Sequence, residues 1–582
     1  MEHYESLGDL KISNDDPRDC TVVILHTHVL RTVGSFFGLG REALQKDQVF
    51  VRKASGLVKE VSWRDALFFN VAYAFPWGGV GIILLSYPWV ASGGSLPIGI
   101  LLAAIGSSFH ITMYALLAMT MPRSGGDYVW VSRILHPAIG FAQSLVIVVG
   151  GFFWFGTGPG ALILFVRNMM AITGAIQNNT GLINSATFLT TPWVVTVLGI
   201  ILSMIYVYIT FFRVRQFFRI QALLIAIMFL GVAILIGLSL FTDHATFIAR
   251  FNSIAAPLTG DNNYAKTLVD TATSDKLLPI PQLSGGAWTW ATLSIMPLAF
   301  WTFSYPYFSA YIAGEWKEAK KTALIAFLGG LAVCLIVILA TTTSIVNVVG
   351  EPLIQALANG YYVHPNTYFG IAPYAYLYAA GMTDNLVLIW IVFAAYILMQ
   401  VLFNLVSLLY VSRCIFAWAF DRVVPEKLGS VSPKYHIPIP AIALSGVVCT
   451  LFFLLFQYIY NLALELTISI VISTLMFSYI IVGFTGILFP FRRKEIYETS
   501  PIQYNVLGVP VISLVGIADV IFLVSLAYFY ISQSAYGAFD WGSYIFFLVL
   551  FCAGLVGYYV SREYRKKQKI DLDLTFREIP PA

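Results

Sequence analysis

The sequence predicts an all-α polytopic membrane protein with twelve transmembrane helices, and three observations support this prediction. Apolar residues make up 58% of the 582 positions, charged residues make up 11%, and the mean hydropathy is +0.78. Soluble domains carry about 25% charged residues, so a water-soluble fold is excluded. Apolar stretches of about 20 residues recur along the chain, which is the length that a helix needs to cross a bilayer. Basic residues are concentrated in alternate connections between these stretches.

Each predicted span is an apolar stretch that ends at polar or charged residues. The twelve stretches lie, in chain order, at residues 65–90, 95–120, 138–172, 191–212, 216–242, 288–313, 322–349, 384–411, 438–459, 463–489, 508–532 and 541–561. The third stretch is longer than a bilayer requires, so we expect it to be tilted or to extend into water. Two long connections, 243–287 and 350–383, are expected on the outer side.

The distribution of lysine and arginine predicts the orientation, because these residues accumulate on the cytoplasmic side of a membrane. If the N-terminus is cytoplasmic, the cytoplasmic segments hold all but four of the 34 basic residues. The four exceptions are Arg167, Arg250, Lys266 and Lys276. We therefore expect a multi-pass protein of the cell membrane with both termini in the cytoplasm. A miscounted helix would have disturbed this alternation, so the charges independently support twelve spans.

No motif in the sequence indicates a catalytic, metal or cofactor site. The five cysteines form no C-x-x-C pair, and the eight histidines follow no H-E-x-x-H pattern. We therefore expect no enzyme activity, no resident cofactor and no nucleic acid partner. The lipid bilayer is the one partner that the apolar spans require. The triplet that begins at Asn178 matches the N-glycosylation pattern on the predicted outer side, although such triplets are common by chance.

Two of the predicted spans contain residues that interrupt a helix. The first span holds Pro76 and Gly78 within residues 75–81, and the sixth span holds Pro306 within residues 303–307. Proline lacks an N–H and disfavours the α conformation in the preceding residue, while glycine tolerates irregular backbone angles. Freed amides favour a carboxylate and freed carbonyls favour an ammonium or a cation. A simple kink is the alternative, because both residues are frequent in membrane helices.

The positions of the two breaks favour a functional role over a simple kink. Each break lies in the first helix of a five-helix block, as expected for a secondary transporter with an inverted repeat and a central binding site. The predicted organisation is a cytoplasmic segment at 1–60, a transporter core at 61–490 with blocks 61–242 and 288–490, two further helices within 508–561, and a cytoplasmic tail at 562–582.

Three stretches of the chain resemble the amino acid–polyamine–organocation (APC) superfamily of transporters. Gly-Val-Gly-Ile at 79–82 resembles the Gly-x-Gly-Ile/Val of the first helix in that family. Residues 121–128, continuing to 136–141, resemble its P-x-x-G-G-x-Y loop, and residues 412–438 are similar to its loop after helix 8. The resemblance covers roughly residues 55–490. It implies the leucine-transporter-type fold, with five-plus-five inverted repeats, broken helices 1 and 6 and two extra helices.

The resemblance also implies where a substrate binds. The amides of Gly79, Val80 and Gly81 would receive a carboxylate, and the carbonyls of Trp301 and Ser304 would receive an amine. The implied binding set is Gly79, Val80, Gly81, Trp301, Thr302, Ser304 and Tyr305. From composition alone, Trp301 is an ordinary packing residue, and only the alignment makes it a gate. Tyr305 and Pro306 depart from the family pattern of a glycine followed by an aromatic residue, and this favours a substrate with a small side chain.

Three polar residues within the spans are candidates for ion or proton coupling. The predicted fifth helix has no lysine, although some proton-coupled relatives carry one at the position of Met228. His110 lies deep in helix 2, where a titratable group is costly, and a hydrogen bond to a neighbouring helix is its alternative role. Asn404 and Ser407 lie where related folds bind sodium, although such residues also join helices. Sodium coupling, proton coupling, exchange and uncoupled transport all remain open.

Transport of amino acids or related amines by alternating access is the function that these features imply. A channel is the first alternative, and it would need a continuous pore lined by rings of charge or carbonyls. No such filter motif occurs in the sequence. A transporter-derived receptor is the second alternative, and a long cytoplasmic signalling domain would favour it. The segment after helix 12 is only about twenty residues long.

Overall fold

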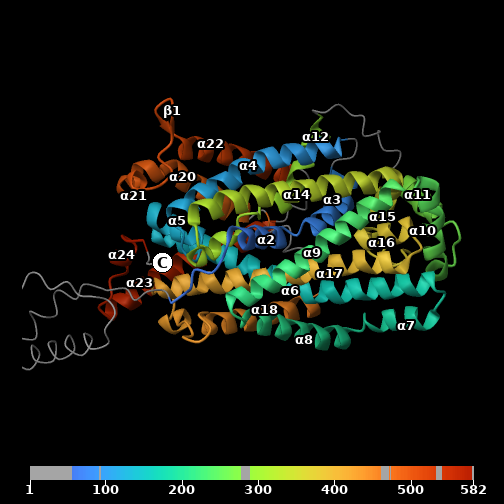
Figure 1. Ribbon diagram of the computed structural model, residues 1–582, viewed down its shortest axis with the longest axis horizontal. Coiled ribbons are helices and arrows are strands. Elements are labelled where there is room, and N and C mark those ends of the chain that lie inside the picture. The colour runs from blue at the N-terminus through green and yellow to red at the C-terminus, as the bar shows by residue number, and fades with distance from the viewer. Residues whose placement is uncertain are drawn as a thin grey trace, which may run out of the picture. The chain divides into compact units, whose positions relative to one another are not determined.

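The computed structural model describes residues 56–90, 94–276, 289–459, 471, 474–532 and 541–579, and most of these residues are helical (Figure 1). Its membrane-length helices are α2 (Trp63–Ala74) with α3 (Pro76–Val90), α4 (Leu96–Thr120), α6 (Pro137–Ile176), α8 (Pro192–Thr210), α9 (Val214–Leu240), α14 (Ala319–Val349), α17 (Leu386–Phe420), α18 (Ile439–Tyr458), η4 (Leu475–Tyr479) with α20 (Ile480–Arg492), α22 (Val511–Ser532) and α23 (Trp541–Lys567). The shorter elements are α5 (Asp127–Ile134), α7 (Thr180–Phe188), α10 (His244–Thr259), α11 (Tyr264–Ser274), α12 (Trp290–Leu293), α13 (Met296–Phe303), η1 (Phe308–Tyr311), η2 (Ala313–Glu315), α15 (Glu351–Tyr362), α16 (Ala375–Met382), η3 (Glu426–Gly429), α21 (Lys494–Glu498), β1 (Asn505–Val506), β2 (Val509–Pro510) and α24 (Leu572–Thr575).

The predicted all-α polytopic membrane fold is confirmed, because the described residues form 11 helices that are long and apolar enough to cross a membrane. Each of them falls on a predicted span, and the remaining prediction, 288–313, falls on short pieces: α12, α13 and two 3-10 turns. The start of the predicted span 463–489 and nearly all of the predicted cytoplasmic segment 1–60 lie outside the described residues.

Two helices extend well beyond the length that a bilayer requires. Helix α6 has 40 residues and α17 has 35, whereas about 20 residues span the hydrocarbon core. Helix α17 was predicted to end at 411, but it continues to Phe420. The added turns are buried, and the charge of Arg413 within them is neutralised by a buried carboxylate. Protein packing therefore sustains the helix beyond its apolar stretch.

The two long connections form a helical layer at one end of the helical bundle, at the right of Figure 1. Helix α11 packs on α15, and α10 packs on α16, so the described part of the first connection, 243–276, lies against the second connection, 350–383. The Asp275 carboxylate accepts hydrogen bonds from Asn359 and from the ring of His364. At the opposite end, at the left of Figure 1, lie α5, α21 and the short β1–β2 hairpin.

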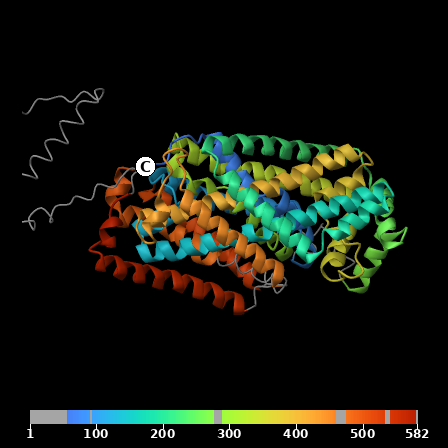
Figure 2. The same ribbon diagram turned by 90° about the horizontal axis from the view of Figure 1, so that it is seen from below.

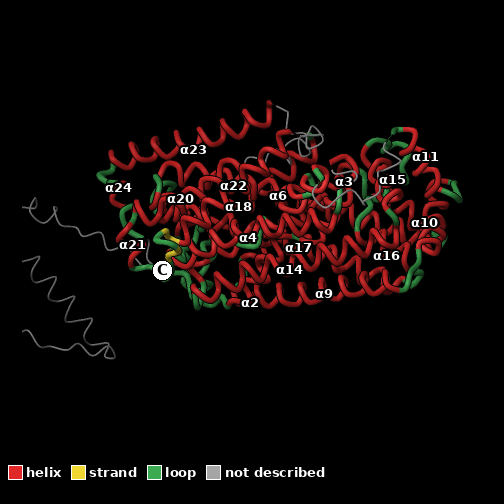
Figure 3. Tube along the Cα trace, turned by 90° about the horizontal axis from the view of Figure 1, so that it is seen from above, coloured by secondary structure: helices red, strands yellow, loops and turns green. Residues whose placement is uncertain are grey.

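The long helices α4, α6, α14 and α17 run through the centre of the bundle (Figures 1 and 3). Helix α17 packs on α2, α6, α9 and α18, and α14 packs on α2 and α4. Helix α23 lies along one side (Figure 2) and packs on α6. There Gly554 permits a close approach, since a Cβ at this glycine would lie 2.6 Å from Cα of Ala142.

Candidate functional site

The first helix break lies at Phe75, one residue before Pro76. Helix α2 ends at Ala74, and Phe75 has left-handed backbone angles of φ 46° and ψ 57° before α3 begins. Proline disfavours the α conformation in the preceding residue and provides no N–H for the helix. A left-handed residue other than glycine costs about 1–3 kcal/mol and is typical of functional sites. The break is thus a strained point within the first membrane span.

The glycines after Pro76 form the first turns of α3. The amide of Gly79 donates to the carbonyl of Phe75 at 3.0 Å. A Cβ at Gly78 would lie 2.0 Å from Cδ1 of Phe75, so this glycine lets the aromatic ring fold over the start of the helix. Carboxylate binding at the Gly79 amide therefore requires that its bond to Phe75 opens first.

The second break separates α13 from the 3-10 turn η1. The amide of Ser304 still donates to the carbonyl of Phe300 at 2.8 Å, but the amide of Tyr305 reaches only the carbonyl of Thr302, at 3.4 Å. Pro306 then removes the next donor, and the chain continues as 3-10 turns rather than as an α-helix. The Ser304 hydroxyl donates to the Trp301 carbonyl at 3.1 Å, so this carbonyl is occupied in the present conformation.

The two breaks lie side by side. A Cβ at Gly79 would lie 2.1 Å from Oγ1 of Thr302, and this hydroxyl is buried without a hydrogen-bond partner among the described residues. A Cβ at Gly81 would lie 2.6 Å from the ring of Tyr374. The glycines therefore allow the start of α3 to approach α13 on one side and the residues before α16 on the other.

Aromatic side chains close around this junction. The Tyr73 ring lies 5.1 Å from the Tyr305 ring and is stacked 5.0 Å from Phe403. The Trp301 ring lies 5.7 Å from Trp154 and 5.9 Å from Tyr305. Trp301 is 7% exposed and Tyr305 is 6% exposed, so both line a closed junction rather than an open path.

Asn70 is a candidate that the sequence analysis missed. This residue of α2 is fully buried, and its side-chain amide donates to the carbonyl of Ala326 in α14 at 3.0 Å. Its side-chain oxygen accepts from the amide of Ser309 at 2.7 Å. Asn70 thereby ties the turn after the second break to the helix before the first break. Asn70 could have been identified from the sequence, because it is an asparagine within an apolar span.

Asn404 and Ser407, the predicted sodium-coupling candidates, lie buried in α17. Both amide atoms of Asn404 are buried without a hydrogen-bond partner among the described residues. A Cβ at Gly158 of α6 would lie 2.1 Å from Oδ1 of Asn404, so the amide packs against that helix. The Ser407 hydroxyl donates to the Phe403 carbonyl in its own helix at 2.9 Å.

His110 lies against a carboxylate that the sequence analysis missed. Its Nδ1 lies 3.3 Å from Oδ1 of Asp519 in α22, and both side chains are fully buried. The signal was present in the sequence, because Asp519 is the one charged residue within the apolar stretch 511–532. The structure therefore joins the predicted coupling residue to a helix outside the two predicted blocks.

The family-like loops meet in a buried ion-pair cluster at the end of the bundle that is predicted to be cytoplasmic. Arg133 of α5 binds Asp421 with two nitrogens, at 2.6 and 2.7 Å. Arg413 of α17 donates to Glu315 at 2.7 Å. Within each pair the two partners lie far apart in sequence, so neither pair was predicted from the sequence.

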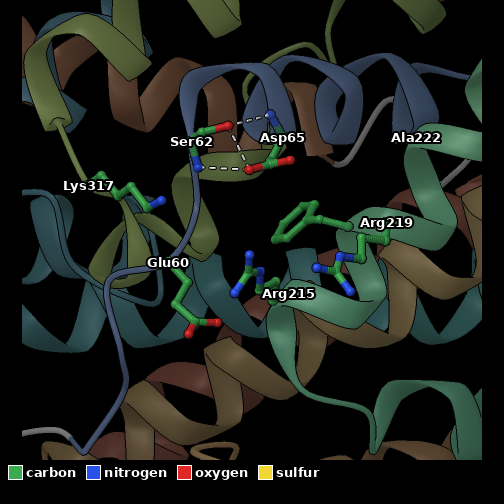
Figure 4. Close-up of a pocket in the computed structure, with 8 residues that line it drawn as sticks. Glu60, Ser62, Asp65, Arg215, Arg219, Ala222 and Lys317 are labelled. Atoms are coloured by element: carbon green, nitrogen blue, oxygen red, sulfur yellow. Dashed lines mark hydrogen bonds between the residues drawn. The ribbon is translucent and has the colours of Figure 1, made fainter.

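A cavity of about 450 Å³ opens beside the start of α2 (Figure 4). Its lining includes the cationic side chains of Arg215, Arg219 and Lys317 and the acidic side chains of Glu60 and Asp65. Asp65 caps the helix by accepting from the backbone and hydroxyl of Ser62. The cavity lies a full helix away from the break at Phe75, so it is separate from the junction of the two breaks.

A family model described as amino acid permease matches residues 62–555, which include both breaks, the ion-pair cluster and α22. A search of curated proteins found no match. Because the family model covers most of the chain, this multi-pass membrane protein belongs to the amino acid permease family of the APC superfamily.

Proposed function

We propose that this protein is a secondary active transporter that moves an amino acid or a related amine across the cell membrane by alternating access. The apposition of the two helix breaks, with Gly79 against Thr302, is the observation that carries this proposal. Two adjacent breaks in mid-membrane can present backbone amides to a carboxylate and carbonyls to an ammonium. In the present conformation internal bonds occupy the Gly79 amide and the Trp301 carbonyl, so substrate binding exchanges these bonds.

A small amino acid fits this site best. Tyr305 and Trp301 pack against each other at the second break, and neither leaves space for a bulky side chain. Among the described residues, the immediate contacts of Gly79 and Gly81 are uncharged. We therefore propose glycine, alanine, serine or a similar small zwitterion as substrate, with backbone groups and the Thr302 hydroxyl as ligands.

Substitution of Gly79 by alanine tests the proposed site. A methyl group here meets Oγ1 of Thr302 at 2.1 Å and forces the two breaks apart. We expect uptake of a radiolabelled amino acid panel into proteoliposomes to fall by about tenfold or more, since a displacement of about 1 Å at a site can cost that much. The matched control is Gly237→Ala in α9, where the added Cβ meets nothing within 4 Å.

The outcome separates the site from general helix packing. Both variants should reconstitute in equal amounts, and Gly237→Ala should transport like the wild type. Equal uptake by Gly79→Ala and Gly237→Ala would remove the glycine junction from the transport pathway. Failure of the wild type to transport any member of the panel would overturn the proposed substrate class.

A further inference from the structure

A buried histidine–aspartate pair joins α4 to α22. The Nδ1 of His110 lies 3.3 Å from Oδ1 of Asp519, and each side chain has 0% exposure. His110 lies within the span Leu96–Thr120, and Asp519 lies within the span Val511–Ser532. Ionisable groups at this depth are expensive, and they mark ion pathways and proton relays in transporters.

Among the described residues, the elements packed on α4 and α22 place no second cation beside the carboxylate. The helices packed along α4 are α12, α13, α14, α20 and α22, and their charged residues other than Asp519 lie at helix ends, at Lys320, Lys321 and Arg492. On the side of α20, a Cβ at Gly483 would lie 3.5 Å from Oδ2 of Asp519. The titratable side chains that face the His110 ring are the tyrosines Tyr114, Tyr307 and Tyr479.

Charge balance therefore requires a proton in this pair. Neutral His110 beside ionised Asp519 would bury an uncompensated negative charge, which is strongly unfavourable in a low-dielectric interior. One additional proton makes the pair neutral overall, on either residue. The nearest approach within the pair is 3.3 Å, and the Nε2 and Oδ2 atoms have no hydrogen-bond partner among the described residues. A hydrogen bond that merely joins α4 to α22 is thus a weak explanation for why these two residues are paired.

The pair also contacts the second helix break from both sides. The His110 ring lies 6.0 Å from Phe300, which precedes the break, and 5.7 Å from Tyr307, which follows it. A movement of residues 304–307 therefore moves the rings that seal the pair. These two contacts are where a change at the break would reach the pair.

Polar groups extend from the neighbourhood of the pair toward the end of the bundle that is predicted to be cytoplasmic. The Tyr114 ring, 4.9 Å from His110, carries a hydroxyl that donates to Oδ2 of Asp127 at 3.3 Å. The Tyr311 hydroxyl donates to the same oxygen at 3.0 Å. Burial raises the pKa of the Asp127 carboxyl to about 6, although hydrogen bonds from Tyr311 lower it. Asp127 is therefore able to exchange a proton near neutral pH.

We propose that His110 and Asp519 form the proton-binding site of this transporter, and that one proton held by the pair moves with each substrate molecule. This inference rests on the proposed transport function. The proton enters the pair from water on one side of the membrane. It leaves to water on the other side, past Tyr114 and Asp127, when the break opens. Asp519 is then a carboxylate and His110 a neutral ring, and water that reaches the pair through the opened break must solvate this charge until the next proton arrives.

Proton flux and substrate flux should be measured together in proteoliposomes. The full-length protein is reconstituted with a pH-sensitive dye inside the vesicles, and the most strongly transported radiolabelled amino acid of the panel is the probe. An inward gradient of about one pH unit supports about tenfold accumulation of a substrate that moves with one proton. We expect the wild type to acidify the lumen on substrate addition and to show this accumulation.

Variants of the pair should lose coupling selectively. Asp519→Asn and His110→Gln should lose lumen acidification and most of the gradient-driven accumulation, yet still show substrate counterflow, which needs no net proton movement. Asp519→Glu, which retains a carboxyl group, should restore part of the coupling. The control is Asp270→Asn, because Asp270 is exposed on α11 and distant in sequence from the pair.

Measurements of proton flux and counterflow test the proposed proton site and the proposed transport function separately. Coupled proton flux that persists in Asp519→Asn or in His110→Gln overturns it. Wild-type counterflow without lumen acidification also overturns it, while the proposed function stands. This measurement uses only the wild type, so its result does not depend on whether a variant folds. Absence of counterflow in the wild type overturns the proposed function itself.

Discussion

Arg413 and Glu315 illustrate, at the scale of single residues, how this protein holds charges in a dry interior. Both side chains are almost completely buried, and Nε of Arg413 lies 2.7 Å from Oε1 of Glu315. The other two guanidinium nitrogens have no partner among the described residues. Desolvation offsets much of the attraction within such a pair, but removal of one partner leaves a buried charge uncompensated.

Glu315→Gln should therefore be strongly destabilising. We expect the free energy of unfolding to fall by about 3–5 kcal/mol, as is typical when a buried pair loses one partner. Denaturant titration of the purified protein in detergent measures the change. Glu318→Gln is the matched control, because Glu318 is exposed and lies 3.9 Å from Lys321. An exposed pair contributes about 0–1 kcal/mol, so similar losses in both variants would contradict this interpretation.

At the scale of elements, the loop between α4 and α5 depends on two glycines with left-handed backbone. Gly125 has φ +101° and Gly126 has φ +53°. Gly125 also donates its amide to the carbonyl of Tyr311 at 3.0 Å, so the loop lies against the turns after the second break. The family-like G-G pair is thus explained by backbone conformation and close packing.

Gly125→Ala should destabilise this junction more than strain alone would. The new Cβ lies 2.5 Å from Cβ of Ala417. Backbone strain of about 1–3 kcal/mol is then added to an overpacking cost of about 1–3 kcal/mol. Gly508→Ala in the β1–β2 hairpin is the control, since Gly508 has φ +79° but nothing within 4 Å of the added Cβ. The melting temperature should fall further in Gly125→Ala than in Gly508→Ala. Equal shifts in the two variants would indicate that the contact with Ala417 adds no destabilisation.

At the scale of the whole molecule, the orientation in the membrane follows from charge. The connection layer of α10, α11, α15 and α16 carries three of the four basic residues assigned to the outer side, Arg250, Lys266 and Lys276. The ion-pair cluster, α21 and the tail are expected in the cytoplasm because most basic residues lie at that end.

Cysteine labelling tests this orientation. With Cys20 and Cys552 replaced by alanine, a cysteine at Asp270 should react with a membrane-impermeant maleimide added to intact cells. A cysteine at Lys569 should react only after the cells are opened. Both positions are exposed in the structure, so access to the side chain is not limiting. The reverse labelling pattern would invert the predicted topology.

The sequence by itself determined the helical membrane fold, eleven of the spans and the positions near which helices 1 and 6 are interrupted. These properties are local, because hydropathy and the backbone chemistry of proline and glycine act within a few residues. Only the tertiary structure showed that the left-handed turn is at Phe75, that Gly79 meets Thr302, that Asn70 joins the two broken segments, and that His110 faces Asp519. Each of these is a contact between residues far apart in the chain, where helix packing sets the distance.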